Sequence, residues 1–460
     1  MRLITLTTTV FLAALTLLPV AASASPRQFA LFQDESLITD NGATRGPTLD
    51  EVKGLGADMI KMQLNWSTVA PGGRTKPKGF DGRDPSQYPG WARYDETIAA
   101  IKARGFKVMV ALAPPAPGWA TPTRGDRVGV TRPNAREFGR FAEAAARRYP
   151  GVDVWTLWNE PNHPRHLYPQ STKGGRPVAP ALYRAMVRAA VRGLQRGGAG
   201  HHPILFGELL PIGKRVDGPK RNLQPLRFLH AFFHGKPLSG LGGFAYHPYT
   251  RPAGPLNPDP TANDATIHSF GRVLKVLDQA RASGKLKSKK KLPIWNTEFG
   301  FQTNPPDPFA ARIAAVPRFW GLSELWFSYS NRRVKSISQY TMDDQPGPAS
   351  QWQSGLRFSN GALKADIYAN YRLPILVRQL GPGAVEVRGA ARPGGAGSTV
   401  QIFQRLGRKG RFKPLGGPIG VRNVRGYFVA RYPIPKAGFR TYYFTTGGQS
   451  SLKVKPVRIF

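Results

Sequence analysis

The chain has 460 residues, more than one hydrophobic core usually organises, so we expect one large domain and a small one. It contains no cysteine, which excludes disulfides, thiol nucleophiles, iron–sulfur clusters and zinc–thiolate sites. Lys plus Arg number 66 against 27 Asp plus Glu, a formal net charge of +39. This excess favours a polyanionic partner such as an acidic polysaccharide, an anionic cell-envelope polymer or nucleic acid. The alternative is a basic composition without a binding role.

The first 24 residues have the features of a secretory signal peptide. Met1-Arg2 gives a short positive start, Leu3 to Val20 is largely apolar, and Ala22-Ser23-Ala24 supplies small residues for cleavage. We therefore predict a secreted protein that is cleaved after Ala24. A membrane anchor is the alternative, but the run is short, and no later segment is apolar enough to span a bilayer.

Eight short apolar runs alternate with helical segments in the region from residue 25 to 374. Their apolar residues are nearly unbroken, as in parallel strands that are buried on both faces. The runs are Phe29–Gln33, Met59–Leu64, Lys107–Leu112, Val154–Trp158, Ile204–Glu208, Gly243–His247, Pro293–Glu298 and Ser336–Thr341. Eight strands, each followed by a helical connection, predict a (β/α)8 TIM barrel. The competing doubly wound sheet needs a glycine-rich turn after its first strand, and Phe32-Gln33-Asp34-Glu35 is not one.

The pattern changes after Pro374, where short alternating segments are separated by Gly, Pro and Asn turns. The expected strands are Val385–Arg388, Thr399–Phe403, Gly426–Ala430, Thr441–Phe444 and Leu452–Val454. Such spacing predicts an antiparallel β-sandwich as an accessory domain over residues 375–460.

Two glutamates stand at the carboxyl ends of predicted strands, where barrel enzymes place their chemistry. Glu160 follows the fourth strand and Glu298 ends the seventh, each flanked by aromatic and amide residues. Cleavage of a glycosidic bond needs two carboxyl groups, one to protonate the leaving oxygen and one to attack or to activate water. The aromatic setting predicts a raised pKa for one of them. For either glutamate alone, a salt bridge or a loop cap is the simpler interpretation.

The motif Asn159-Glu160-Pro161, with a glutamate ending the seventh strand, resembles the retaining glycoside hydrolases of clan A, families 5 and 39 above all. The resemblance covers roughly residues 28 to 372. It implies that Glu160 is the acid/base, that Glu298 is the nucleophile and that Asn159 binds the sugar 2-hydroxyl. His247-Pro248-Tyr249 is similar to the His-x-Tyr that lines the cleft in these enzymes, which implies that Tyr249 contacts the nucleophile. The implied substrate is a poly- or oligosaccharide, with no cofactor or metal.

The chain departs from family 5 at three strands. Lys61 stands where arginine is usual on the second strand, which keeps the charge without the bidentate fork. The third strand lacks the histidine that family 5 often carries. The eighth ends near Tyr340 where tryptophan is common, so we expect Tyr340 or Trp352 to form the sugar platform.

Other polar and aromatic residues near strand ends allow two interpretations. Trp66, Trp119 and Trp295 are predicted to stack on pyranose rings, with packing in the core or rim as the alternative. His163 and His166 have the spacing of metal ligands, but no matching ligand is evident and a polar loop is favoured. Glu208 ends the fifth strand as a cleft residue or as part of an ion pair.

The alternative function is a catalytically lapsed barrel that binds carbohydrate or a polyanion in the cell envelope. The altered second strand favours it, whereas the presence of both glutamates opposes it. Esterase, zinc protease and nucleotide-binding functions lack their minimal motifs. Nucleic acid is not expected as a partner.

Overall fold

The computed structural model describes residues 25 to 460 except 26, 123–126, 348–351, 435–437 and 460. The predicted signal peptide, residues 1–24, lies outside the described residues. Within the described part of the chain, no helix has both the length and the apolar character needed to cross a bilayer.

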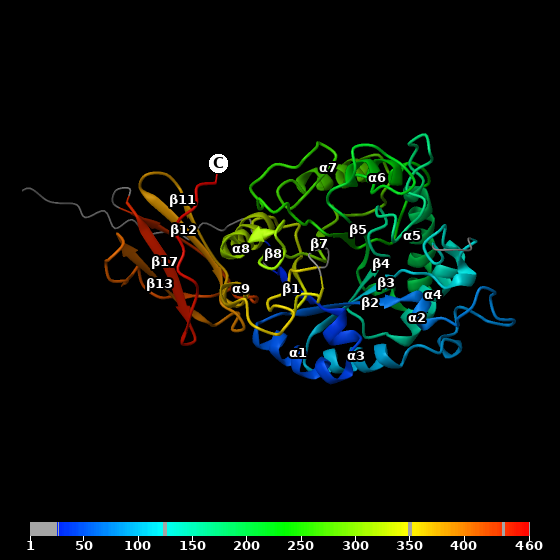
Figure 1. Ribbon diagram of the computed structural model, residues 1–460, viewed down its shortest axis with the longest axis horizontal. Helices are drawn as coiled ribbons and strands as arrows, with labels where there is room; N and C mark the ends of the chain where they lie inside the picture. Colours follow the sequence, from blue (N-terminus) through cyan, green and yellow to red (C-terminus); the bar gives the residue numbers. More distant parts are fainter. Residues whose placement is uncertain (1–24, 26, 123–126, 348–351, 435–437, 460) are drawn as a thin grey trace, which may run out of the picture.

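A parallel eight-stranded sheet forms the larger part of the molecule (Figure 1). Its strands are β1 (Phe29–Gln33), β2 (Met59–Asn65), β3 (Lys107–Ala113), β4 (Val154–Leu157), β5 (Ile204–Leu209), β6 (Gly243–Tyr246), β7 (Ile294–Asn296) and β10 (Ser336–Tyr340). They pair in the order β10-β1-β2-β3-β4-β5-β6-β7, and a parallel bridge from Ile294 to Val334 brings the two ends together. The predicted TIM barrel is therefore confirmed.

Helices surround this barrel (Figure 1). They are α1 (Gly42–Gly54), α2 (Trp66–Val69), α3 (Ala92–Ala103), α4 (Ala135–Arg148), α5 (Ala179–Arg196), α6 (Pro225–Phe233), α7 (Gly271–Ala282), α8 (Val316–Gly321) and α9 (Ala365–Arg372). Asn134 caps α4 by accepting from the backbone N–H groups of Arg136 and Glu137. Phe138 on the buried face of α4 packs edge-on against Trp158, just after β4. Helix α4 thus supports the loop that carries Glu160.

The interior of the barrel has two layers of opposite character. Its lower layer is apolar and consists of Leu31, Met59, Met109, Val154, Leu205, Ala245 and Trp295. Side chains two residues further along a strand point to the same side, so the next layer up contains Lys61, Thr156 and His247. All three are buried. The charged groups of the barrel therefore lie directly beneath its carboxyl-end mouth.

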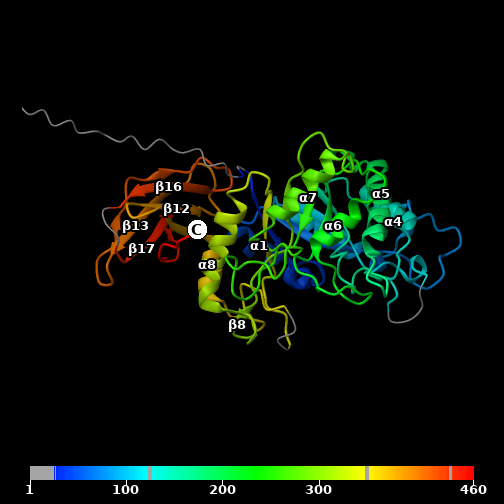
Figure 2. The same ribbon diagram turned by 90° about the horizontal axis from the view of Figure 1, so that it is seen from above.

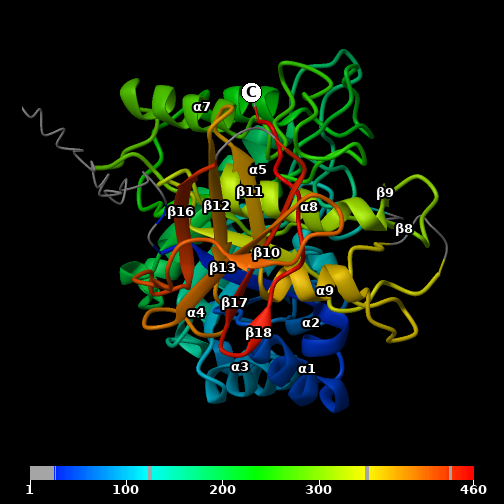
Figure 3. The same cartoon turned by 90° about the vertical axis from the view of Figure 1, so that its left-hand side faces the viewer.

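The strands after Pro374 form two antiparallel sheets (Figure 3). One contains β11 (Ile375–Gln379), β12 (Ala384–Ala390) and β16 (Tyr427–Pro433); the other contains β13 (Thr399–Leu406), β14 (Lys413–Pro414), β15 (Ile419–Gly420), β17 (Arg440–Thr446) and β18 (Gln449–Ser450). Alternate residues of both sheets share one core, as a sandwich requires. The predicted strand Leu452–Val454 is wrong, since only a single bridge joins Val454 to Tyr442, and β11 was not predicted.

A buried cluster joins the barrel to the sandwich. Glu324 lies in the π-helical segment Leu322–Ser328. This segment follows α8, which lies between the barrel and the sandwich (Figure 2). Its carboxylate is paired with Arg392, and it accepts hydrogen bonds from the Tyr427 hydroxyl at 2.7 Å and from the Trp320 indole at 2.6 Å. Leu325 and Tyr427 also belong to an apolar cluster shared by both parts.

This cluster predicts a large loss of stability when its cation is removed. Arg392→Ala leaves the buried Glu324 carboxylate without its charge partner, and we expect a loss of about 3–5 kcal/mol in the free energy of unfolding. Equilibrium unfolding in urea measures it. The control is Arg83→Ala, since Arg83 pairs with Asp81 on the surface, and its unfolding midpoint should stay within error. Equal midpoints for both variants would contradict a structural role for the cluster.

Candidate active site

Strand-end residues with left-handed backbone surround the mouth of the barrel. Trp158 has a φ of 69°, Glu160 of 40° and Glu208 of 51°. For residues other than glycine such a conformation costs about 1–3 kcal/mol each, and it persists where the surroundings enforce it. Here the backbone N–H of Glu160 donates to the Glu208 carbonyl at 3.0 Å, and the Trp158 indole donates to the His166 carbonyl at 2.9 Å. These bonds fix the direction of the Glu160 side chain.

Glu298 follows β7 and faces the same space. It is nearly buried, and the Tyr249 hydroxyl donates to its Oε1 at 3.0 Å. Burial, followed by the charge of Glu298, raises the pKa of Tyr249 well above its ordinary value. The phenol therefore keeps its proton and holds one oxygen of the carboxylate in place. This contact matches the one that the clan resemblance implies for Tyr249.

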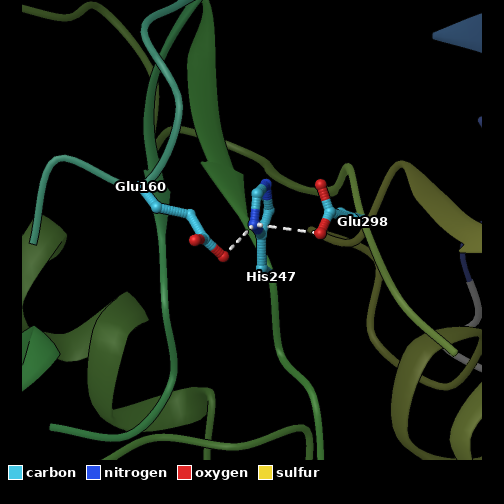
Figure 4. Close-up of side chains that lie close together, drawn as sticks. All are labelled: Glu160, His247 and Glu298. Atoms are coloured by element: carbon cyan, nitrogen blue, oxygen red, sulfur yellow. Dashed lines mark hydrogen bonds and ion pairs between the residues drawn. The ribbon is translucent and has the colours of Figure 1, made fainter. Parts of the chain in front are cut away.

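His247 lies between the two glutamates (Figure 4). Its Nδ1 is 3.1 Å from Oε1 of Glu160 and 3.9 Å from Oε1 of Glu298. One oxygen of each glutamate and one nitrogen of His247 all lie within 4.8 Å of one another. The carboxylates that follow β4 and β7, two strands that are not neighbours in the barrel, thus lie close together beside a buried imidazole.

The charges of this group differ from the sequence-based expectation. Burial would raise the pKa of Glu160, but the neighbouring His166 and His247 outweigh burial and hold the pKa well below its usual range. The prediction of a raised pKa is therefore wrong for Glu160. The raised pKa belongs to Glu35, just after β1, where burial raises it to about 8 against the opposing charge of Lys61.

Beneath His247 lies a charged layer. Glu208 accepts from Lys61 Nζ at 2.6 Å and from the Thr156 hydroxyl at 2.7 Å, and its Oε2 is 2.5 Å from His247 Nε2. Burial of Glu208 raises its pKa, but the charges of Lys61 and His247 outweigh burial and lower the pKa to about 2. Glu208 is thus part of an ion pair inside the barrel. Lys61 pairs with Glu208 and not with Glu298.

An aromatic wall stands beside Glu298. Trp352 stacks on Tyr249 with ring centroids 4.9 Å apart, and Tyr340 meets Trp352 edge-on at 5.9 Å. Tyr249 and Trp352 line a cavity of about 280 Å³ that also contains Arg251 and the exposed ring of Phe309. Tyr340 and Trp352 therefore lie where the sequence analysis expected a sugar platform, and Phe309 adds a further aromatic surface that it missed.

The predicted stacking roles of Trp66 and Trp295 are wrong. Trp66 is fully buried, because the chain turns into α2 directly after β2 and places the indole flat against Phe141 at 5.7 Å. Trp295 points into the lower layer of the barrel and stacks on Phe29 at 5.8 Å. Both rings pack in the core and have no free face for a sugar.

Trp119 and Asn159 have intermediate positions. The Trp119 ring is partly buried, meets Trp66 edge-on at 6.1 Å and donates its indole N–H to the Pro71 carbonyl at 2.9 Å. Its place in this packed cluster gives no support to sugar stacking. Asn159 is buried beside Glu160, and its Oδ1 has no hydrogen-bond partner among the described residues. A buried acceptor of this kind is suited to an incoming hydroxyl group.

One group of three side chains in the described part of the chain has the spacing to hold a metal ion, namely Glu160, His247 and Glu298. Two carboxylates and an imidazole suit zinc or a similar ion. However, Nδ1 of His247 already faces both carboxylates, and these atoms are also the ones that acid–base chemistry needs. The rings of His163 and His166 are 5.3 Å apart, and His166 turns its Nδ1 towards Glu160 Oε2 at 3.4 Å.

Glu35 and His166 lie near Glu160 and Glu298 and were not assigned to the site from the sequence. Glu35 stands just after the first strand, as Glu160 stands just after the fourth. Its position at a strand end is therefore a sequence signal that could have identified it. His166 lies in the loop after β4, six residues from Glu160, and a loop path of this kind leaves no periodic signal.

No protein-family model matches the chain, and no curated protein matches it. Among solved structures, it is similar to a β-glucuronidase of Bacteroides uniformis, with 12% identity and a TM-score of 0.46. That alignment covers 94% of this chain and 46% of the β-glucuronidase, so the chain spans about half of that protein's length. An endo-1,4-β-mannanase of Rhizomucor miehei has 12% identity and a TM-score of 0.44, over 75% of this chain and 94% of the mannanase. A glycoside hydrolase family 5 enzyme of Prevotella bryantii has 9% identity and a TM-score of 0.45, over 73% of this chain and 94% of that enzyme.

Proposed function

We propose that the protein is a glycoside hydrolase that cleaves O-glycosidic bonds of a poly- or oligosaccharide with retention of configuration. The observation that carries this proposal is the meeting of Glu160 and Glu298, whose nearest ligand oxygens lie within 4.8 Å. Retaining enzymes hold their carboxyl groups about 5–5.5 Å apart, whereas inverting enzymes leave about 6.5–9.5 Å for a water. The spacing in this site favours the retaining mechanism.

In the first step, a Glu298 oxygen attacks the anomeric carbon and the bond to the leaving oxygen breaks. Tyr249 donates to Oε1 of Glu298, which leaves Oε2 as the attacking atom. Glu160 delivers a proton to the leaving oxygen, so the aglycone departs as a neutral alcohol. The product of this step is a glycosyl ester of Glu298.

In the second step, Glu160 is a carboxylate and acts as a base. It takes a proton from water, whose oxygen attacks the anomeric carbon from the side that the aglycone left. The ester bond to Glu298 breaks, and the sugar leaves with its original configuration. Both steps use the protein's own side chains.

Sugar binding is assigned to residues around this pair. The unpaired Oδ1 of Asn159 is placed to accept from the sugar 2-hydroxyl, and Trp352 with Tyr340 offers a stacking surface. The cavity with Arg251 and Phe309 extends beyond Trp352 and would hold a further sugar unit. A cleft of this composition supports a substrate of more than one residue.

We further propose that the protein is secreted and binds anionic envelope polymers. The features of residues 1–24 support secretion. Polymer binding is supported by a cavity of about 470 Å³ formed just before strands β6, β7 and β10, at the amino end of the barrel. Its basic lining consists of Lys289, Lys290, Lys291, Arg332, Arg333 and Lys335.

A glycan screen tests the proposed function. Wild type and Glu160→Gln are incubated side by side with a library of polysaccharides, oligosaccharides and aryl glycosides. We expect wild type to release reducing sugar from at least one class and Glu160→Gln to lose that release. Binding of the same glycan by both proteins, without release by either, would support the lapsed carbohydrate-binding barrel instead.

A further inference from the structure

His247 makes contacts that a neutral imidazole cannot satisfy on its own. Its Nε2 faces Glu208 at 2.5 Å and its Nδ1 faces Glu160 at 3.1 Å, and the ring is completely buried. A neutral ring carries one N–H, so it can donate to only one of two carboxylates. Either the ring carries a second proton or one of the carboxyl groups does.

Glu208 is poorly suited to be the protonated partner. Lys61 Nζ and the Thr156 hydroxyl already donate to its two oxygens, and the side chains of Lys61 and Glu208 are fully shielded from solvent. Hydrogen bonds to a carboxylate and a cation 2.6 Å away both stabilise its charged form. The second proton is therefore held by the Glu160–His247 pair.

We propose that Glu208, fixed by Lys61, is a positioning residue that keeps a proton on the Glu160–His247 pair for delivery to the leaving oxygen. The inference rests on the proposed function, and it assigns roles to two residues, Lys61 and Glu208, that the clan resemblance does not. The ion pair beneath the mouth thus acts through His247, without contact with the sugar.

The proton balance is as follows. In the resting site His247 is an imidazolium and Glu160 a carboxylate. As the glycosidic bond breaks, the Nδ1 proton of His247 passes to Glu160, and Glu160 delivers it to the leaving oxygen. Glu160 is then again a carboxylate, and His247 is a neutral ring whose Nε2–H still donates to Glu208. In the second step Glu160 removes a proton from water, and that proton returns to Nδ1.

The groups facing the pair agree with this assignment. Glu298 lies 3.9 Å from Nδ1, and its charge adds to that of Glu208 in raising the pKa of His247 to about 9 against the opposing effect of burial. His166 approaches Glu160 from the other side at 3.4 Å. Among the described residues, further titratable groups interact with this site, namely Lys61, Glu35, Asp34, His163, Tyr249 and Tyr340. The pair should hold its proton until the pH approaches 9.

The first test is the pH profile of kcat/KM on a glycoside with a poor leaving group. We expect the basic limb of wild type to lie near pH 9. Glu208→Gln removes an anion from beside the imidazolium, so its proton is lost at lower pH, and the basic limb should move down by about one unit or more. On an aryl glycoside whose leaving group needs no proton, the two proteins should differ little. Equal losses on both substrates, without a shift of the limb, would overturn the proposal.

The second test measures the proton directly and needs no activity. Full-length protein with 15N-labelled histidine rings is titrated by NMR, and His247→Asn identifies the resonances. Both His247 nitrogens should remain protonated to about pH 9 in wild type, and titration near the ordinary value of about 6.5 would overturn the proposal. Glu143→Gln, which removes a buried carboxylate of α4 paired with Arg147 and Arg196, is the matched control for Glu208→Gln and should leave His247 unchanged.

The two tests separate this inference from the proposed function. If wild type hydrolyses no glycan while His247 keeps its second proton, the proposed function fails and the charge assignment stands. If wild type is active while His247 titrates near 6.5, the charge assignment fails and the proposed function stands. Should Glu208→Gln fail to fold, the wild-type titration alone decides.

Discussion

Glu298→Ala should lose about five orders of magnitude in kcat on every substrate that wild type cleaves, as expected when a nucleophile that acts as a unit with its neighbours is removed. The reason is that Glu298, which Tyr249 holds in place opposite Glu160, is the group assigned to attack the anomeric carbon, and alanine has no atom that can replace it. Steady-state rates on an activated aryl glycoside measure the loss. Glu143→Gln, with its carboxylate on the outer helix α4, should keep wild-type rates.

Azide provides a second test of the nucleophile, because this small anion can occupy the space left by the Glu298 carboxylate. In Glu298→Ala it should attack the anomeric carbon directly and give a glycosyl azide of inverted configuration. A residual rate of one tenth of wild type, with no azide product, would mean that Glu298 is not the nucleophile.

Glu160→Ala should show a loss that depends on the leaving group. General acid catalysis is worth about 10²–10⁴-fold, and we expect a loss in kcat/KM of that order on glycosides with alcohol leaving groups. Activated aryl glycosides leave without protonation, so on them the loss in kcat/KM should be much smaller. Rates across a series of leaving groups of different pKa measure this dependence.

In this variant azide replaces water in the second step. It attacks the glycosyl ester of Glu298 and should give a glycosyl azide with the configuration of the substrate, the opposite of the Glu298→Ala product. An equal loss on all leaving groups, without an azide effect, would contradict the role of Glu160.

The barrel could be predicted from sequence because its strands are buried on both faces. The bounds predicted for Phe29–Gln33 agree with the structure, since this run begins and ends with its pairing to β10. The seventh strand is shorter than predicted, because its pairing with β6 stops at Asn296 although Thr297 and Glu298 are still buried. Sequence patterns indicate which residues are buried, and at the mouth of a barrel residues remain buried beyond the last pair of the strand.

The tryptophans show where position along a strand is insufficient. Trp66 follows a strand end, as a cleft residue would, but a helix begins at that residue and turns the ring onto Phe141. Trp295 lies two positions before Thr297 and faces the lower layer of the barrel. The direction of a side chain depends on its contacts with segments far away in the chain, and a single sequence does not show those contacts.

The charge arrangement was the least predictable part of the site. Glu160 and Glu298 are found from their places at strand ends, yet the ionisation of Glu160 depends on His166, in the loop after β4, and on His247, just after β6. The resemblance to family 5 implies that Lys61 keeps the charge of the usual arginine without its bidentate fork. In the structure Lys61 forms an ion pair with Glu208, so its effect reaches the acid/base through His247.

The stereochemistry of the first product tests the central claim most directly. Proton NMR during the first minutes of hydrolysis, before mutarotation mixes the anomers, reports the configuration of the released sugar. With one oxygen of Glu160 and one of Glu298 within 4.8 Å of each other, there is too little room for an attacking water between carboxylate and sugar. The first-formed sugar should therefore have the anomeric configuration of the substrate. Initial release of the opposite anomer would mean that water attacks directly, and Glu298 would then be a base and not the nucleophile.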